Sequence, residues 1–342
     1  MKDKKQYIAS YFHKTKTILE NETPNNEIVL QFFQRKDNAI LGGMNEVLEL
    51  LEAQTNTNNY KIKYLPEGTL IHNCEVVLEL IGPYHEFGIW EGMIDGILAR
   101  STSIASNAYK CVQAANGKDV IFMGDRADHY LNQEVDGKAV ALGGIKFVST
   151  LAQKQTAKSI DDEAVFGSMP HALIQSFDGD VVKATEAYIK YFPNHKIISL
   201  VDYNNNVIED ATKIYQHFGN KVYGVRVDTG KAMCDHMFDD EEPQYGVTPE
   251  QIFRLRQALD DIGAKDYKII VSSGFNAKKI ALFEGLKVPV DFYGVGHSIF
   301  SLNNSFSADA TMLNGKEQAK EGRFYRHNEN LVLYQPKNKA SQ

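Results

Sequence analysis

The sequence predicts an α/β protein in which an incomplete β/α-barrel is combined with an α/β sandwich domain formed from both chain ends. The barrel is indicated by short apolar segments that each end in glycine or a charged residue, with amphipathic helical segments between the later ones. In such barrels the functional loops leave the carboxyl ends of the strands, so these endings also predict where a site lies. The segments are 120–126 (VIFMGDR), 164–171 (AVFGSMPH), 197–202 (IISLVD), 222–230 (VYGVRVDTG), 269–274 (IIVSSG) and 291–297 (DFYGVGH).

The barrel helices are predicted from apolar residues three and four apart, at 147–155, 180–192, 207–219, 249–263 and 276–285. Thr248 and Pro249 form a typical helix start, and Gly219, Gly263 and Gly285 are placed to end helices. The segment 139–145 (AVALGGI) predicts a seventh strand. An open doubly wound sheet is the alternative, but no GxGxxG motif follows the first strand, which favours the barrel.

The first hundred residues predict a different module. Strands are expected at 27–35, 60–68 and 75–84, and helices at 15–22, 44–53 and 86–115. After residue 307 the chain returns to short strands (GRFYRHN and NLVLYQP), which we expect to pair with the N-terminal sheet. The predicted domains are therefore 1–116, the barrel at 117–305, and a segment at 306–342 that returns to the first domain.

Composition excludes several classes of protein. The 342 residues are 43% hydrophobic, enough for a large core, and the net charge of −7 argues against a nucleic-acid partner. Cys74, Cys111 and Cys234 form no CxxC pair, so neither a zinc ribbon nor a disulfide framework is indicated. There is no signal-peptide pattern, and no apolar run approaches the roughly 18 residues of a membrane helix. We expect a cytoplasmic protein without a membrane partner.

Two glycine-containing turns predict phosphate binding. The segments 272–276 (SSGFN) and 294–298 (GVGHS) each follow a strand and precede a helix or turn. Glycine lets the backbone approach an anion, and the loops after the last two strands are the usual phosphate site of β/α-barrels. The alternative is that these glycines only make tight turns.

Charged residues at the other strand ends predict catalysis. Arg226 and Asp228 are two residues apart on a strand, so their side chains share one face, and Asp202 ends another strand. His171 and Arg126 also lie at predicted strand ends. The alternatives are a salt bridge for Arg226 and Asp228, a helix cap for Asp202, a structural histidine and a surface arginine.

Together these residues indicate a phosphorylated sugar substrate. Carboxylates near an anomeric carbon stabilise an oxocarbenium-like centre or hold Mg²⁺ on a pyrophosphate. This leaves phosphoribosyl transfer, sugar-phosphate isomerisation or an aldol reaction, although the strand-end lysine that a Schiff-base aldolase requires is not evident.

The chain resembles the nicotinate phosphoribosyltransferases, in particular the short archaeal and bacterial branch of the type II phosphoribosyltransferases. The group also includes the nicotinamide and quinolinate enzymes. The motifs that carry the resemblance follow one another in the family's order along nearly the whole chain. They are 10–15 (SYFHKT), 41–51 (LGGMNEVLELL), 87–108 (FGIWEGMIDGILARSTSIASNA), 167–174 (GSMPHALI), 200–205 (LVDYNN), 225–230 (VRVDTG), 271–276 (VSSGFN) and 294–299 (GVGHSI).

The resemblance implies a homodimeric enzyme of NAD salvage, with Tyr11 stacking on the base in the partner's barrel. It implies that Asp202, Arg226 and Asp228 handle the ribose, the pyrophosphate and Mg²⁺, and that His171 is phosphorylated when ATP hydrolysis is coupled. Arg126 would face the pyridine base. The remaining substrate-binding residues that it implies are Lys14, Thr229, Gly230, Ser273, Gly274, Gly294, Val295, Gly296 and His297.

Two departures from the family pattern bear on function. Members that take nicotinate usually carry two consecutive arginines where this chain has Arg126 and Ala127. The aspartate commonly found in the family two positions before the stacking tyrosine is Ala9 here. The expected substrate is nicotinate with 5-phosphoribosyl pyrophosphate. The alternatives are an enzyme for nicotinamide or another base, and a non-catalytic protein that binds a phosphosugar or nucleotide.

Overall fold

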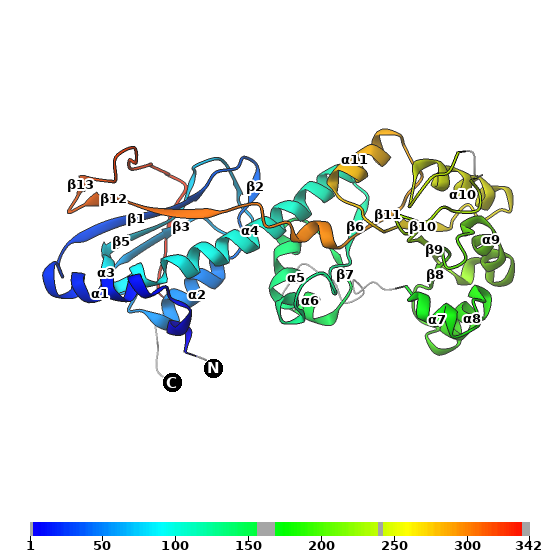
Figure 1. Cartoon of the computed structure of the whole chain (residues 1–342), viewed down its shortest axis with the longest axis horizontal. Coiled ribbons are helices and arrows are strands. Elements are labelled where there is room, and N and C mark those ends of the chain that lie inside the picture. The colour runs from blue at the N-terminus through cyan, green and yellow to red at the C-terminus, as the bar shows by residue number, and fades with distance from the viewer. Residues whose placement is uncertain (1–2, 156–167, 239–241, 337–342) are drawn as a thin grey trace. The chain divides into compact units, whose positions relative to one another are not determined.

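The computed structural model describes residues 3–155, 168–238 and 242–336, and the chain divides into two compact units. Unit 1 comprises Met1–Ser106 and Ser301–Gln342, and unit 2 comprises Asn107–Phe300 (Figure 1). The division falls within helix α4 (Glu91–Ala114), so the last turns of this helix count with unit 2.

Unit 1 is built on an antiparallel sheet that contains both ends of the chain. The strand order is β13-β12-β1-β5-β3-β14. The C-terminal strand β12 pairs with β1, and β14 pairs with β3, which confirms the expected return of the tail to the N-terminal sheet. The strands are β1 (Glu27–Gln34), β3 (Lys61–Tyr64), β5 (Val76–Pro83), β12 (Phe306–Leu313), β13 (Lys316–Glu317) and β14 (Val332–Leu333), with β2 (Ala39–Ile40) and β4 (Leu70–Ile71) in a separate pair.

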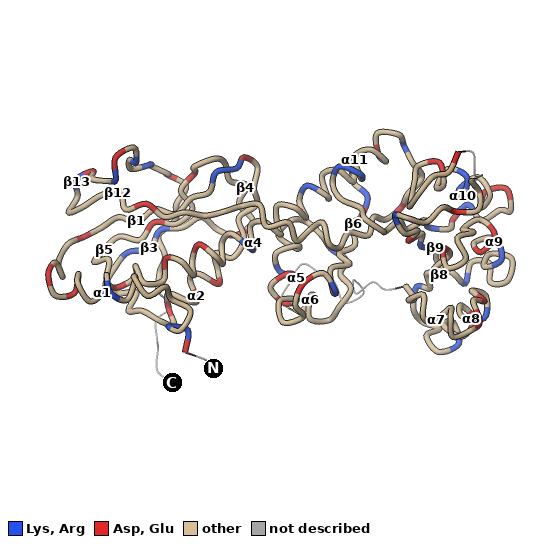
Figure 2. Tube along the Cα trace, in the orientation of Figure 1, with Lys and Arg blue, Asp and Glu red and all other residues tan. Residues whose placement is uncertain are grey.

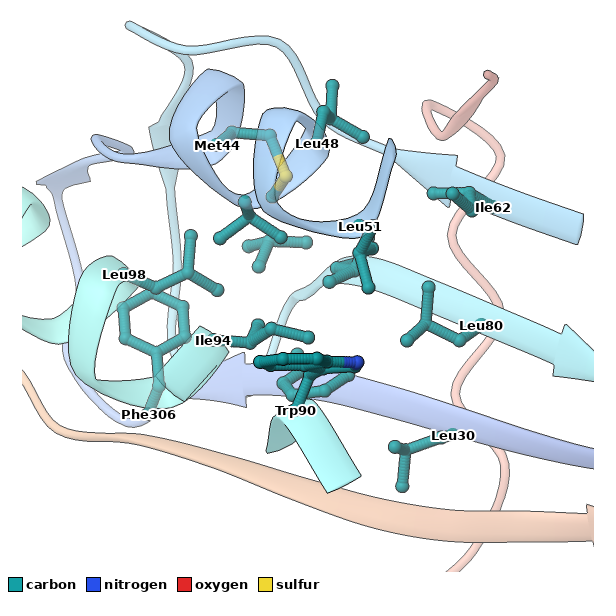
Figure 3. Packing of buried hydrophobic residues seen from close by; sticks show 14 of the residues in the cluster. Leu30, Met44, Leu48, Leu51, Ile62, Leu80, Trp90, Ile94, Leu98 and Phe306 are labelled. Carbon is teal, nitrogen blue, oxygen red and sulfur yellow. The ribbon is translucent and has the colours of Figure 1, made fainter. Parts of the chain in front are cut away.

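The core of unit 1 lies between this sheet and its helices. Trp90 is 1% exposed and lies between side chains of α2 and those of the sheet, with Leu51 and Leu30 on opposite sides of it (Figure 3). Helix α2 buries Met44, Val47, Leu48, Leu50 and Leu51, the apolar face that its sequence spacing predicts. The helices are η1 (Lys4–Tyr7), α1 (Ser10–Glu22), α2 (Met44–Gln54), α3 (Tyr84–Phe87) and η2 (Gly88–Trp90).

Unit 2 carries a parallel sheet of six strands that curls into part of a barrel, as the sequence predicts. The order is β7-β6-β11-β10-β9-β8, and every pairing in it is parallel. Parallel pairing brings all the carboxyl ends to one edge. The strands are β6 (Asp119–Phe122), β7 (Phe147–Val148), β8 (Ile198–Leu200), β9 (Gly224–Val227), β10 (Lys268–Val271) and β11 (Phe292–Val295).

Helices follow the strands of unit 2. They are η3 (Tyr130–Asn132), α5 (Gln133–Leu142), α6 (Leu151–Gln155), α7 (His171–Gln175), α8 (Val181–Tyr191), α9 (Val207–Phe218), η5 (Gly219–Lys221), α10 (Pro249–Asp261), α11 (Ala277–Gly285) and η6 (His297–Phe300). In the described part of the chain no helix is long and apolar enough to cross a membrane.

Three predictions of secondary structure are wrong. The expected strand at 139–145 belongs largely to helix α5, whose buried Asp136, Ala139 and Val140 follow a helical spacing that a short apolar run does not reveal. The expected helix at 147–155 begins as strand β7 and becomes helical only at Leu151, because Gln153 accepts hydrogen bonds from the Ser149 and Thr150 amides and ends the strand there. No strand forms at 322–328, where the Arg326 amide bonds to a side chain instead.

A fourth predicted strand, 164–171, lies mainly outside the described residues. Its described end, 168–170, is irregular and leads into α7, which begins at His171. The position of His171 at a loop that follows a strand therefore stays a prediction.

The N-cap of α8 yields a test of local stability. The Asp180 carboxylate accepts hydrogen bonds from the Val182 and Lys183 amides at 3.0 Å each. We expect Asp180→Ala to lower the free energy of unfolding by about 1 kcal/mol and Asp180→Asn, which can still cap, to lower it much less. Urea unfolding of both variants measures the difference. Equal destabilisation of the two variants would contradict a capping role.

The same contacts predict a pH dependence. The Lys183 amide bond, followed by weaker contacts, holds the pKa of Asp180 below its ordinary value. A lowered pKa contributes stability above the ordinary carboxyl range, and this contribution is lost as the pH falls. The alanine variant should lack it.

Candidate functional site

The carboxyl ends of the parallel strands in unit 2 surround a cavity of about 850 Å³. Residues from the loops after β6, β7, β9, β10 and β11 line it, together with the segment before α7. The lining residues are Met123, Asp125, Arg126, Ala127, Ser149, Ser168, Met169, Pro170, His171, Arg226, Asp228, Ser272, Ser273, Gly274, Gly294, Gly296 and His297.

Arg226 and Asp228 lie together in this cavity, as their shared strand face predicts. Arg226, on β9, donates from Nη2 to the Met169 carbonyl at 3.3 Å, and its Nε is buried without a partner in the described part of the chain. Asp228 follows β9 and accepts a 2.6 Å hydrogen bond from the Ser272 hydroxyl at the end of β10. The guanidinium thus retains donors for a ligand, and the carboxylate is held in place by the neighbouring strand.

Asp202 and His171 form a dyad beside this pair. Oδ2 of Asp202 lies 3.2 Å from Nε2 of His171, and the imidazole is 48% exposed while the carboxylate side chain is 4% exposed. Oδ1 of Asp202 is buried and has no partner among the described residues. Burial raises the pKa of Asp202, the charge of Asp228 raises it further, and His171 and Arg226 oppose the change. Asp202 is not among the residues that line the cavity, and it meets the cavity through its contact with His171, which does line it.

The two glycine turns both reach the cavity. Ser273 and Gly274 have positive φ angles of 69° and 73°, and the first is unusual for a residue that is not glycine. Strained backbone of this kind gathers at ligand-binding loops. Gly296 is also required by packing, because a Cβ there would lie 2.6 Å from the Met123 carbonyl oxygen. Packing thus supports the tight-turn alternative at Gly296, and its role in phosphate binding stays a prediction.

Arg126 lines the cavity in the loop after β6 and is exposed. It is flanked by Asp125 and Ala127, which also line the cavity. Ala127, at the position that would hold a second arginine, thus presents a methyl group. Asp125, which precedes Arg126, presents a carboxylate. This loop has a mixed charge.

The remaining predicted residues do not line the cavity. The side chain of Thr229 is fully buried and accepts a hydrogen bond from Gln251 at 3.0 Å, and Val295 is fully buried in β11. Gly230 turns the chain after β9, where its carbonyl accepts from the Met233 amide. Tyr11 and Lys14 are exposed on α1 of unit 1, three residues apart and therefore on one helix face.

Sequence reasoning missed several lining residues. Ser272 stands in the motif SSGFN beside the predicted glycine turn, and its bond to Asp228 appears only when β9 and β10 pair. Asp125 directly precedes Arg126 and could have been found from that adjacency. Ser149 could not, because its strand β7 was expected to be helical.

The donor set fits a hard cation that is shared with a ligand. In residues 3–155, 168–238 and 242–336 no three His, Cys, Asp or Glu side chains form a metal cluster. Asp202 and Asp228 nevertheless bring two carboxylates together, with Oδ1 of Asp202 unpartnered. Magnesium is commonly held by one or two carboxylates with the phosphates of a substrate, which this pair would allow.

Comparison with known sequences identifies relatives of the chain. Residues 10–102 match the family model described as quinolinate phosphoribosyl transferase, N-terminal domain. Nicotinate phosphoribosyltransferase pncB2 of Mycobacterium tuberculosis (strain ATCC 25618 / H37Rv) is 28% identical over 237 residues, which cover 68% of this chain and 46% of the relative. The nicotinate phosphoribosyltransferase of Bacillus subtilis (strain 168) is 23% identical over 244 residues, covering 69% and 45%. The chain matches about half the length of these relatives.

Solved structures extend the likeness to almost the whole chain. The nicotinate-nucleotide pyrophosphorylase from Pyrococcus furiosus superposes with a TM-score of 0.82 at 28% identity, covering 96% of this chain and 82% of that one. The human nicotinic acid phosphoribosyltransferase shares the fold, with a TM-score of 0.71 at 15% identity, covering 91% and 76%. These matches and the order of the motifs agree: the chain is similar to nicotinate and quinolinate phosphoribosyltransferases in sequence and in fold.

Proposed function

We propose that this protein is a phosphoribosyltransferase that joins a pyridine base, nicotinate, to 5-phosphoribosyl pyrophosphate, which yields the mononucleotide and pyrophosphate for NAD salvage. The observation that carries the proposal is the grouping of Arg226, Asp228 and the Asp202–His171 dyad with two glycine turns at one cavity. The relatives named nicotinate phosphoribosyltransferases support the choice of reaction.

The reaction breaks one bond and forms another at a single carbon. The ring nitrogen of the base gives its electron pair to C1 of the ribose, and the bond from C1 to the pyrophosphate oxygen breaks with its electrons leaving on pyrophosphate. Positive charge builds on the ribose ring between these events. We infer that Asp228, in the cavity lining, and Asp202, next to His171, would stabilise that charge with their carboxylates. The unpartnered Nε of Arg226 and its remaining donors would bind the departing pyrophosphate.

Magnesium, when bound, would supply positive charge to the leaving pyrophosphate. Asp202 and Asp228 are the residues that we expect to hold it. The Ser272 hydroxyl keeps Asp228 facing the cavity, and the turn at Ser273 and Gly274 offers backbone for the 5′-phosphate. Gly294, Gly296 and His297 would complete that phosphate site from the neighbouring strand.

The proposal also assigns residues to the binding of the base, to the contact with a second subunit and to the reaction with ATP. Arg126 would meet the nicotinate carboxylate. Tyr11, 61% exposed on α1, would stack on the base in the site of a partner subunit within a homodimer. His171 would accept a phosphoryl group from ATP, which would couple ATP hydrolysis to the synthesis.

The direct test uses purified protein with phosphoribosyl pyrophosphate and Mg²⁺, and with nicotinate, nicotinamide or quinolinate added separately. We expect pyrophosphate release with nicotinate. Release with nicotinamide alone would show that nicotinamide, and not nicotinate, is the substrate. Quinolinate is less favoured than nicotinamide, because it carries two carboxylates and Arg126 is flanked by Asp125 and Ala127. No release with any base, with or without ATP, would reject the proposal.

Ser272 provides a finer test of how Asp228 is positioned. We expect Ser272→Ala to lower kcat about tenfold, because a hydroxyl bonded to a carboxylate contributes about that factor. KM should change less, and Ser272→Thr should restore most of kcat. Ser176→Ala is the control, since that hydroxyl is exposed and bonds to the Ala172 carbonyl of its own turn. An unchanged kcat in Ser272→Ala would show that Asp228 does not depend on the bond.

A further inference from the structure

Two lysines converge on the turn that contains Ser273 and Gly274, from outside the cavity lining described above. Lys231 lies three residues after Asp228, in the loop that follows β9. A Cβ on Gly274 would lie 2.7 Å from Cε of Lys231 and 3.6 Å from its Nζ, so the lysine stem crosses this turn. Gly274 itself lines the cavity, which places the Lys231 ammonium group beside the cavity wall.

Lys279 approaches from the first turn of α11, a helix that carries basic residues (Figure 2). Its Nζ lies 4.3 Å from the centre of the Phe275 ring and 5.8 Å from that of Phe283. Burial first, and then the charge of Lys231, lower the pKa of Lys279 to about 8. The two ammonium groups are therefore close enough to repel each other.

No carboxylate balances this pair in the part of the chain that the structure describes. Glu284, the acidic residue on α11, pairs with Lys118 at 2.7 Å and accepts a hydrogen bond from Tyr293. The other groups packed against the Lys279 amine are the two phenylalanine rings. Lys231 is exposed and Lys279 is partly buried, and a partly buried cation beside a second cation is unfavourable unless an anion joins them. Perturbed groups of this kind gather at binding sites.

We propose that Lys231 and Lys279 form a phosphate-binding subsite on the Gly274 turn, which takes the phosphate monoester end of the ligand held in the cavity. This inference rests on the proposed function for the identity of that ligand. The monoester can come from the 5′-phosphate of the phosphoribosyl substrate or from the terminal phosphate of ATP. Asn276, which caps α11 through the Lys279 amide, fixes the helix start next to the same turn.

The subsite predicts that phosphate binding depends on pH. A bound dianion favours the charged form of Lys279 and raises its pKa again. Sugar phosphates lose their second proton near pH 6 and are dianions above pH 7.5. A change in affinity above pH 7.5 therefore reflects the titration of a group on the protein. The affinity should then fall as the pH rises through about 8, where Lys279 loses its proton.

The experiment measures the binding of ribose 5-phosphate and, separately, of ATP to the full chain by calorimetry between pH 7.5 and 9. We expect Lys279→Met to weaken binding about tenfold at pH 7.5, as expected for the loss of one charged hydrogen bond, and to flatten the pH dependence. Lys231→Met should also weaken binding, but it should move the midpoint to higher pH because the repulsion is gone. Lys278→Met is the matched control, since this neighbouring lysine is exposed on the same helix.

The two probes separate the sources of the phosphate. If Lys279→Met binds ribose 5-phosphate more weakly, the subsite takes the phosphate of the sugar. If the variant binds only ATP more weakly, the subsite takes the terminal phosphate of the nucleotide. If Lys279→Met binds both as tightly as Lys278→Met and keeps the wild-type pH profile, the subsite is rejected. Because binding is measured without turnover, this result is independent of whether pyrophosphate is released with any base.

Discussion

Replacing Asp202 with asparagine is expected to abolish most of the turnover while leaving the protein at least as stable as the wild type. The residue is 6% exposed, its carboxylate lies against His171, and it carries a buried Oδ1 without a partner in the described residues. Asparagine keeps the shape and can still accept from His171, but it removes the negative charge that the developing ribose cation requires. We expect kcat to fall by about 10²–10³, the usual cost of removing one such electrostatic contact.

The stability expectation follows from the direction of the pKa shift. Burial raises the pKa of Asp202, so the fold prefers its protonated form. The contribution of such a group to stability is fully present below its unfolded pKa and is lost as the pH rises through the folded pKa. At neutral pH the ionised carboxylate therefore destabilises the fold, and asparagine relieves that cost. The gain in Tm over the wild type should be larger at pH 8 than at pH 5.

Asp210→Asn is the control for this prediction. Asp210 is also a buried carboxyl whose pKa burial raises, but it lies on α9, bonds to Asn204, and does not line the cavity. Its asparagine variant should retain turnover. The assignment of Asp202 fails if Asp202→Asn keeps wild-type kcat, or if it loses both activity and Tm as an ordinary core defect would.

The residues that the sequence placed correctly share a physical reason. Arg226 and Asp228 could be assigned to one cavity because side chains on a strand alternate, and parallel strands end at one edge. The pairing of the tail with β3 was predictable because the segment NLVLYQP is short and apolar, whereas β12, which pairs with β1, was not expected as a strand. These inferences require only the local pattern of apolar residues and the general rules by which strands pair in a sheet.

The features that the sequence did not reveal depend on contacts between distant segments. Gly137 illustrates this within α5, because a Cβ there would lie 1.8 Å from the Gln153 carbonyl oxygen of α6, and no periodicity encodes that approach. The convergence of Lys231 and Lys279 likewise joins the loop after β9 to the helix after β10. The local apolar pattern of 139–145 was ambiguous between strand and helix, and tertiary packing decided it.

Replacing His171 with alanine is expected to remove all covalent labelling by ATP. The bond of Nε2 to the Asp202 carboxylate at 3.2 Å requires the proton on Nε2 when that carboxylate is ionised, which leaves the electron pair on Nδ1. The imidazole is 48% exposed and lines the cavity, so a phosphoryl donor can reach it. Nδ1 would attack the terminal phosphorus of ATP, the bond to the bridging oxygen would break, and ADP would leave with that electron pair.

Incubation of the wild type with γ-labelled ATP and Mg²⁺ should leave acid-labile phosphate on the protein, and His171→Ala should leave none. His217→Ala, on the outer helix α9, is the matched histidine control and should label like the wild type. Asp202→Asn should label more slowly, because a neutral amide accepts the Nε2–H hydrogen bond less strongly than a carboxylate and so favours the tautomer with a free Nδ1 less. Ribosyl transfer and phosphorylation would then share one carboxylate, Asp202, which acts on the ribose through its charge and on His171 through its hydrogen bond. Label that persists in His171→Ala would remove the histidine from the ATP step and leave Asp202 with the ribose alone.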